Sequence, residues 1–134
     1  SVAVLALVSG LFTLVSAQTY PTITADDVSN STREIWCDQQ KGICPNLCQD
    51  QTHADPVNND CWSEDLHYEC VCVNNVRPNL SEYSLTIPYN LCLQGIQACA
   101  DNCGNNQDCA NLCFSGKQCG ASGPRRVNST TSTS

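Results

Sequence analysis

The chain has 134 residues, of which 12 are Cys, and its 13 acidic residues against 6 Lys and Arg give a net charge of -7. All twelve Cys lie between Cys37 and Cys119, a density that is typical of a disulfide-stapled secreted domain and excludes a reduced cytosolic core. The acidic balance argues against nucleic-acid binding, which needs clustered Lys and Arg.

Residues 1–17 form an uncharged stretch rich in Val, Leu and Ala, followed at once by polar residues. This pattern predicts a secretory signal peptide without its charged start, in keeping with a chain that contains no Met. We expect cleavage after Ala17, because small residues are preferred just before the cut. A retained signal anchor is the alternative, but Ser9, Gly10 and Thr13 interrupt a stretch shorter than the ~20 apolar residues of a membrane span.

The mature chain divides by composition into three segments. Residues 18–30 have no apolar periodicity and predict an extended leader, and residues 31–120 form the Cys-rich domain. Residues 121–134 are rich in Ser and Thr and predict a glycosylated stalk that is cut off in mid-run. N-glycosylation sequons occur at Asn30, Asn79 and Asn128.

The first Cys-rich stretch has the spacing C-x6-C-x3-C, which places three Cys on one helical face. Gly42 and Pro45 interrupt this stretch, so we predict two short helices, Thr32–Lys41 and Pro45–Gln51. A Ser-x-x-Glu capping box that begins at Ser31 predicts the start of the first helix.

The same Cys spacing returns in residues 89–103, where the sequence predicts a single helix. Thr86 is suited to cap this helix, and Pro88 is compatible with its first turn. Gly104 is suited to end it.

Two C-x3-C pairs, Cys99 with Cys103 and Cys109 with Cys113, flank a turn rich in Gly and Asn. Each pair puts both sulfur atoms on one helical face, so we predict two antiparallel helices joined by nested Cys99–Cys113 and Cys103–Cys109 disulfides. Twelve Cys allow on the order of ten thousand pairings, and the other pairs stay open. The predicted disulfide residues are Cys37, Cys44, Cys48, Cys61, Cys70, Cys72, Cys92, Cys99, Cys103, Cys109, Cys113 and Cys119.

Residues 66–73 alternate in polarity and predict a strand with Cys70 and Cys72 on one side. Residues 80–87 predict either a second short strand or an extended segment, and the turn-forming residues between the two allow a reversal. The predicted fold class is therefore a small, disulfide-rich, mainly α domain with six disulfides, in which a short β-hairpin can form.

The sequence carries no recognisable catalytic or metal-binding signature. His53 lies in a polar loop and His67 in the predicted strand, and neither belongs to a known catalytic motif. Zinc sites favour C-x2-C or C-x4-C thiolate pairs, whereas the pairs here are C-x3-C and C-x-C in a chain with an export signal. We therefore expect no enzyme activity, no metal and no cofactor.

The aromatic residues supply the one recognition hypothesis that the residues themselves support. Trp36 and Tyr89 are expected in the core, because a stapled domain this small has few other large apolar side chains to bury. Trp62 lies in a polar turn, where core and ligand-contacting roles are equally open. An exposed indole there could stack on the sugar rings of a cell-wall polysaccharide.

Three segments carry a family resemblance: WCDQQKGICPNLC at residues 36–48, YECVC at residues 68–72 and PNLSEYSLTIPYNLC at residues 78–92. They resemble an uncharacterised family of fungal secreted Cys-rich proteins, a domain of unknown function. The resemblance implies a fungal surface protein with a signal peptide, one Cys-rich domain and a Ser/Thr-rich stalk. Members often end in a GPI-anchor signal, so membrane contact is expected only through such a lipid anchor.

The progression of Cys48, Cys61, Cys70 and Cys72 is also similar, more weakly, to the fungal CFEM domain, a helical eight-Cys module. Some CFEM members bind haem through an Asp ligand, and Asp60 is the matching candidate here. The twelve Cys and the later spacing depart from the CFEM pattern. A CFEM-like small-ligand or haem-binding module is thus the alternative to our main prediction, a non-enzymatic extracellular protein of the fungal cell surface or wall. The biochemical activity of such a protein is not predicted, and carbohydrate contact is one hypothesis for it.

Overall fold

The computed structural model describes residues 19–121, which form three α-helices, a two-stranded antiparallel hairpin and three short 3-10 turns. The predicted disulfide-rich, mainly α fold is confirmed, hairpin included. The expected signal peptide and the sequon at Asn128 lie outside the described residues.

Helix α1 runs without a break over Asn30–Thr52, so the prediction of two short helices is wrong. Pro45 lies inside the helix and removes one backbone donor, which frees the carbonyl of Lys41 four residues earlier. The side-chain amide of Asn59 donates to that carbonyl at 2.8 Å, so the hydrogen bond is replaced from outside the helix. The helix therefore continues past a residue that would otherwise break it.

The start of α1 also differs from the prediction. Ser29, rather than Ser31, is the N-cap, and its hydroxyl accepts a hydrogen bond from the backbone N–H of Thr32 at 3.3 Å. At the other end, His53 adopts a left-handed conformation with φ 59° and closes the helix.

Strands β1 (Asn58–Trp62) and β2 (His67–Val71) form the hairpin. The predicted strand at residues 66–73 is confirmed over β2, but its partner precedes it in the chain instead of following it.

Residues 80–87 are neither a strand nor a continuous extended segment, because a 3-10 turn (Leu80–Glu82) and bends occupy them. The hydroxyl of Thr86 lies 2.8 Å and 2.9 Å from the carbonyl oxygens of Leu80 and Tyr83, and these contacts hold the segment in a compact turn.

Helix α2 (Ile87–Asp101) begins as predicted, with Thr86 as the N-cap and Pro88 in the first turn. Helix α3 (Gln107–Ser115) begins at the N-cap Asn106, whose side chain accepts from the backbone N–H of Cys109 at 3.0 Å. Gly104 lies in the turn between the two helices with φ +62°, a conformation that a glycine adopts without strain.

All twelve Cys are paired, and both disulfides of the predicted nested staple are present. Three disulfides tie α1 to the hairpin and to the residue just after it, and we call this region, residues 29–72, the helix–hairpin half. Three more lie within α2, α3 and the chain up to Cys119, and we call this region, residues 87–119, the two-helix half. The pairs are Cys37–Cys61, Cys44–Cys70 and Cys48–Cys72 in the former, and Cys92–Cys119, Cys99–Cys113 and Cys103–Cys109 in the latter.

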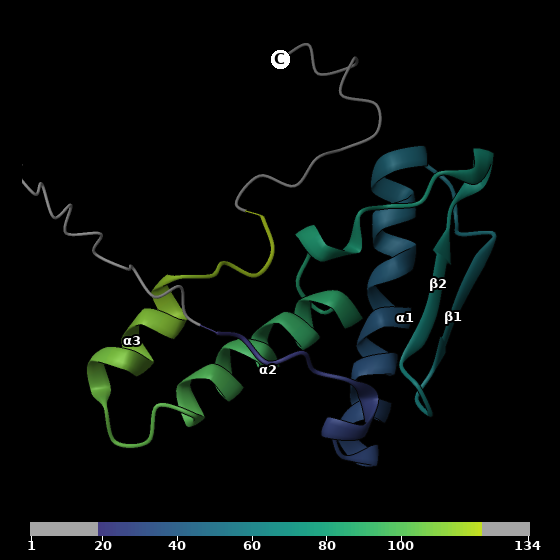
Figure 1. The fold of residues 1–134 in the computed structure, drawn as a ribbon. Coiled ribbons are helices and arrows are strands. Elements are labelled where there is room, and N and C mark those ends of the chain that lie inside the picture. The colour runs from purple at the N-terminus through teal and green to yellow at the C-terminus, as the bar shows by residue number, and fades with distance from the viewer. Residues whose placement is uncertain (1–18, 122–134) are drawn as a thin grey trace, which may run out of the picture.

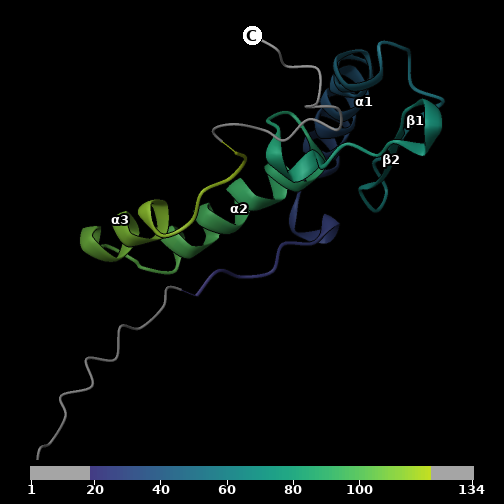
Figure 2. The ribbon, with the colours of Figure 1, turned by 90° about the horizontal axis from the view of Figure 1, so that it is seen from above.

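Figures 1 and 2 show how the halves are arranged: α2 leads away from α1, and α3 folds back on the distant end of α2. Residues 19–28 run beside α2 toward the start of α1. This segment, predicted as an extended leader, packs into the fold: Val28 is buried against Trp36, and Tyr20 packs on the two-helix half. Trp36 lies in the core as predicted, whereas Tyr89 is only half-buried.

Candidate functional site

The outer face of the hairpin is the candidate site. Asn59 and Cys61 are turned toward α1, because they bond to the carbonyl of Lys41 and to Cys37. Side chains alternate along a strand, so their neighbours in β1 lie on the opposite face, away from α1. Together with their partners across the ladder, the residues of this outer face are Asn58, Asp60, Trp62, His67, Glu69 and Val71.

A stacked aromatic pair occupies one end of this face. Trp62 pairs directly with His67 across the two strands, and the ring centroids lie 4.9 Å apart with an interplanar angle of 29°. The Trp62 side chain is nevertheless 43% exposed. The pair therefore forms a rigid aromatic surface that remains open to solvent.

Two hydrogen bonds fix the turn that joins the strands beside this pair. The Asp65 carboxylate accepts from the backbone N–H of His67 at 2.9 Å, and the guanidinium of Arg33 donates to the carbonyl of Glu64 at 2.9 Å. The second bond anchors the turn to α1. The aromatic pair is thus held by the strand ladder on one side and by the anchored turn on the other.

Apart from the buried Val71, polar groups line the rest of the outer face. The amide of Asn58 donates to the Glu69 carboxylate, and the exposed Asp60 lies directly opposite Glu69 in the ladder. On the inner side, burial raises the pKa of the Tyr68 hydroxyl above its usual value, because desolvation disfavours the phenolate. The outer face therefore combines an aromatic end with carboxylate and amide groups that can accept and donate hydrogen bonds.

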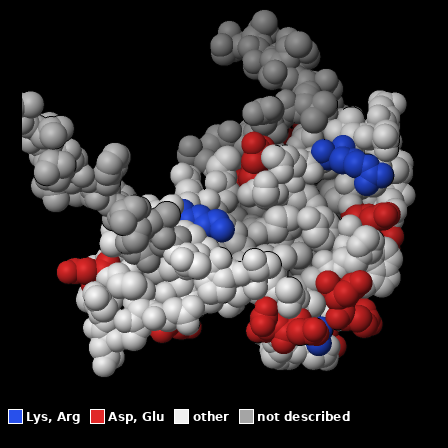
Figure 3. Space-filling view, viewed as in Figure 1, with Lys and Arg blue, Asp and Glu red and all other residues white. Residues whose placement is uncertain are grey.

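The surroundings of the aromatic pair are acidic. Figure 3 shows Asp and Glu side chains gathered at the lower right, over the start of α1 and the tip of the hairpin. Exposed carboxylates at this end belong to Asp26 and Asp27 before α1 and to Glu64 and Asp65 in the hairpin turn. A negatively charged ligand would be repelled from this end of the molecule.

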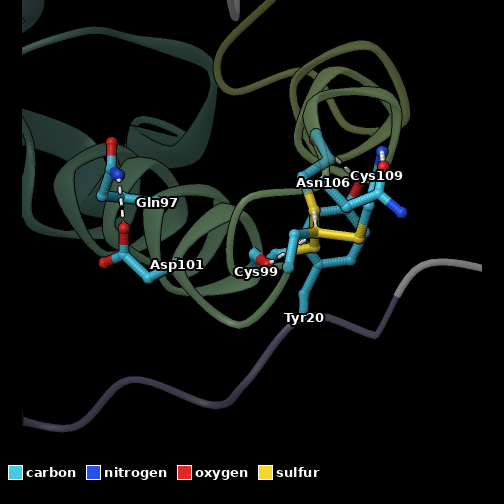
Figure 4. The surroundings of a disulfide bond; sticks show 8 residues. Tyr20, Gln97, Cys99, Asp101, Asn106 and Cys109 are labelled. Carbon is cyan, nitrogen blue, oxygen red and sulfur yellow. Dashed lines mark hydrogen bonds between the residues drawn. A yellow bond between two sulfur atoms is a disulfide. The ribbon is translucent and has the colours of Figure 1, made fainter.

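A concave feature apart from the hairpin lies between residues 21–23 and α2. It is a groove of about 390 Å³ whose walls carry the carboxylates of Asp27 and Asp101 and the amides of Gln94 and Gln97. Gln97 donates to Asp101 at 2.9 Å, as Figure 4 shows. The apolar side chains of Pro21, Ile23 and Ala98 also line the groove, but Asp60, the candidate haem ligand, does not.

The sulfur atoms of Cys44, Cys48 and Cys70 lie within 4.8 Å of one another, a spacing that resembles a metal site. Each of the three atoms already belongs to a disulfide, Cys44–Cys70 or Cys48–Cys72. Zinc binds thiolates, and an oxidised sulfur is not a thiolate. The cluster is therefore a pair of neighbouring disulfides.

The two histidines are not brought together. His53 ends α1, whereas His67 starts β2 next to the hairpin turn that is anchored near the start of α1. Sequence reasoning singled out Trp62 but missed His67 as its stacking partner. The signal was the five-residue spacing across a Ser-Glu-Asp-Leu turn, which pairs the two residues once β1 is recognised as a strand.

Two of the predicted glycosylation sites lie in the described part of the chain, and both are exposed. Asn30 is the first residue of α1, where its amide donates to Glu34 at 3.3 Å. Asn79 precedes the 3-10 turn, and its side chain accepts from the hydroxyl of Ser81 at 2.7 Å. Glycosylation at either site stays a prediction.

A family described as Domain of unknown function (DUF7707) matches residues 21–124. The chain belongs to this family. The matched DUF7707 region contains every Cys, the aromatic pair and part of the segment that packs along α2. No curated protein and no solved structure matches the chain. Among residues 19–121, no helix is long and apolar enough to cross a membrane.

Proposed function

We propose that this DUF7707 domain is a non-enzymatic extracellular module of the fungal cell surface or wall that contacts neutral polysaccharide through Trp62 and His67. The observation that carries the proposal is the stacked pair itself, with Trp62 43% exposed on a hairpin that is fixed to α1. Six disulfides support an extracellular setting, because such a density persists only in an oxidising compartment.

The chemistry of the outer face fits a sugar better than an apolar ligand. An indole ring offers a flat apolar surface on which the C–H face of a pyranose can lie, and little conformational entropy is lost because the ring is already held. The nearby Asp60 and Glu69 carboxylates and the Asn58 amide can bond to ring hydroxyls. This combination of one aromatic surface and a few polar groups is typical of a small-ligand contact site.

The charge distribution narrows the class of polysaccharide. The exposed carboxylates at the hairpin tip disfavour polyanionic chains such as uronic acid polymers. A neutral glucan or chitin does not meet this repulsion. Placement at the wall or on a lipid-anchored stalk is supported by the fungal resemblance and by the Ser/Thr-rich residues 121–134.

Retention of the purified chain on insoluble β-glucan and chitin tests this proposal. We expect wild type to be retained and Trp62→Ala to lose at least ~80% of the retention, with Trp62→Phe intermediate, since removal of a stacking ring costs about 1 to 3 kcal/mol. Ile35→Ala is the matched control, because Ile35 is an exposed apolar residue of α1 outside the hairpin. Equal retention of wild type and Trp62→Ala, with native disulfides in both, would refute the proposal.

A further inference from the structure

The nested staple between α2 and α3 contains two disulfides of different accessibility. The inner disulfide joins Cys99 and Cys113, which are 3% and 0% exposed, and the Tyr20 side chain packs against it. The outer disulfide joins Cys103 and Cys109, which are both partly exposed. Figure 4 shows the two sulfur bonds next to one another at the α2–α3 turn, with Tyr20 beside them.

Among the six disulfides, only two have both sulfur-bearing residues partly exposed: Cys103–Cys109 and Cys92–Cys119. These two differ in the loop that each closes. Cys103–Cys109 spans 6 residues and Cys92–Cys119 spans 27. A disulfide that closes a shorter loop constrains the unfolded chain less, so Cys103–Cys109 stabilises the fold less than Cys92–Cys119 does.

The helices also decide which sulfur atom of the outer disulfide leaves when a thiol attacks. Cys109 lies in the first turn of α3, where the backbone N–H groups and the helix dipole favour a thiolate. Cys103 follows the end of α2, and its sulfur lies 3.4 Å from the carbonyl oxygen of Cys99, which disfavours a thiolate there. The carboxylate of Asp108 in the first turn of α3 is exposed to solvent and weakens this contrast without reversing it.

We propose that Cys103–Cys109 is a thiol-exchange site at which a small monothiol of the glutathione type becomes attached to Cys103. The incoming thiolate attacks the sulfur of Cys103 and forms a mixed disulfide. The Cys103–Cys109 bond breaks, its electron pair leaves on Cys109, and the Cys109 thiolate takes a proton from water. One disulfide is exchanged for another, so the step needs no further oxidant or reductant.

The inner disulfide keeps α2 and α3 joined after this exchange, so the modification does not release α3. The direction of attack is nonetheless critical. The sulfur of Cys103 lies only 3.9 Å from that of Cys113, so a thiolate released on Cys103 would attack the inner disulfide and move the free thiol to Cys99. Attack at Cys103 avoids that rearrangement because the released thiolate is on Cys109.

Brief exposure of the oxidised full chain to glutathione, followed by alkylation and peptide mapping by mass spectrometry, tests the proposal. We expect glutathione on Cys103 and the alkyl label on Cys109, both appearing at least about tenfold faster than any modification of Cys92 or Cys119. First labelling at Cys92, Cys119 or Cys99 would overturn the assignment.

Two matched variants sharpen the result. The pair Cys103→Ser and Cys109→Ser should lose the fast glutathione addition, whereas the pair Cys92→Ser and Cys119→Ser should keep it. Far-UV circular dichroism checks that each variant is folded. If the first pair fails to fold, the order of labelling in the wild-type chain still decides for or against the proposal.

Discussion

The helix–hairpin half and the two-helix half contain three disulfides each but use them differently. In the former, buried sulfur atoms lie among large apolar side chains such as Trp36, Leu47 and Leu66. In the latter, the buried cluster between α2 and α3 consists of Cys99, Ala100 and Cys113, while Ile87 packs with the Trp36 cluster and Ile96 is buried outside both. Disulfides therefore cross-link an existing core in one half and largely constitute the core in the other.

This difference shows how a chain with few large apolar residues can stabilise two helices that have little else to bury. A short helix pair is marginal in water unless packing or a cross-link holds it. The nested staple supplies that link and leaves Leu112 and Phe114 of α3 exposed at 53% and 54%. The two-helix half should accordingly be the first to lose its structure when the disulfides are reduced, because few other buried side chains hold α2 to α3.

Stepwise reduction tests that dependence and has the largest expected effect. Each disulfide contributes about 2 to 4 kcal/mol, so the loss of all six, about 12 to 24 kcal/mol, is comparable to or larger than the roughly 5 to 15 kcal/mol by which a domain is stable, and the whole fold should unfold. In a titration with reductant, hydrogen exchange should rise in α2 and α3 before it rises in α1. A metal chelator should not change hydrogen exchange in any of the three helices. Earlier loss of protection in α1 would contradict the comparison.

Removal of one disulfide from each half is the next largest test. Cys44–Cys70 and Cys92–Cys119 span 26 and 27 residues, so their loop entropies are nearly equal at about 3.5 kcal/mol. Cys44 and Cys70 are 0% and 5% exposed, so replacing both by Ala also leaves a void and should cost about 1 kcal/mol more than the same change at Cys92 and Cys119.

Urea unfolding of the two double variants measures this difference directly. The midpoints should fall in both, and further in the variant that lacks Cys44–Cys70. Equal midpoints, with equal denaturant slopes, would show that the sulfur atoms of the helix–hairpin half contribute no packing beyond the cross-link.

The junction between the two halves contains no disulfide, because all twelve Cys pair within one half or the other. A change at the junction should therefore lower the stability less than the loss of a disulfide does. The side-chain carbonyl of the fully buried Gln40 in α1 accepts from the backbone N–H of Ile87 at the start of α2, at 2.9 Å. Gln40→Met keeps the volume but leaves that buried N–H without its acceptor. The side-chain amide nitrogen of Gln40 is buried without a hydrogen-bond partner, so removing it offsets part of the stability that is lost with the acceptor.

We therefore expect Gln40→Met to lower the free energy of unfolding by about 1 to 2 kcal/mol in urea titrations. Gln39→Ala is the control, because Gln39 bonds to the side chain of Asn90, which can turn to solvent. A Gln40→Met variant as stable as Gln39→Ala would mean that the buried bond from Ile87 to Gln40 contributes no more than an exposed one to holding the two halves together.

Local sequence rules predicted the two-helix half far better than the helix–hairpin half. Thr86, Pro88 and the C-x3-C pairs all act within a few residues of their helix, so the N-terminal cap, first turn and staple followed from spacing. The continuity of α1 depends on Asn59, which is 18 residues away from the carbonyl it bonds. The Trp62–His67 pair depends likewise on a strand with no apolar alternation to reveal it.

The smallest expected effect concerns the hydrogen bond from Asn59 to Lys41, which tests why α1 continues through Pro45. Asn59→Ala should cost about 0.5 to 1.5 kcal/mol, because the freed carbonyl loses its donor and has to bond to water. Pro45→Ala restores a backbone N–H that can reach the same carbonyl, so in that background Asn59→Ala should cost measurably less.

A double-mutant cycle in urea isolates this coupling. Asn58→Ala is the matched control, since Asn58 is the neighbouring Asn of β1 but bonds to Glu69 and should show no coupling to Pro45. If Asn59→Ala costs the same with Pro45 and with Ala at that position, the helix is not sustained by the replacement bond. Its continuity would then follow from the disulfides at Cys44 and Cys48, which hold the turns on either side of Pro45 against the hairpin and the residue after it.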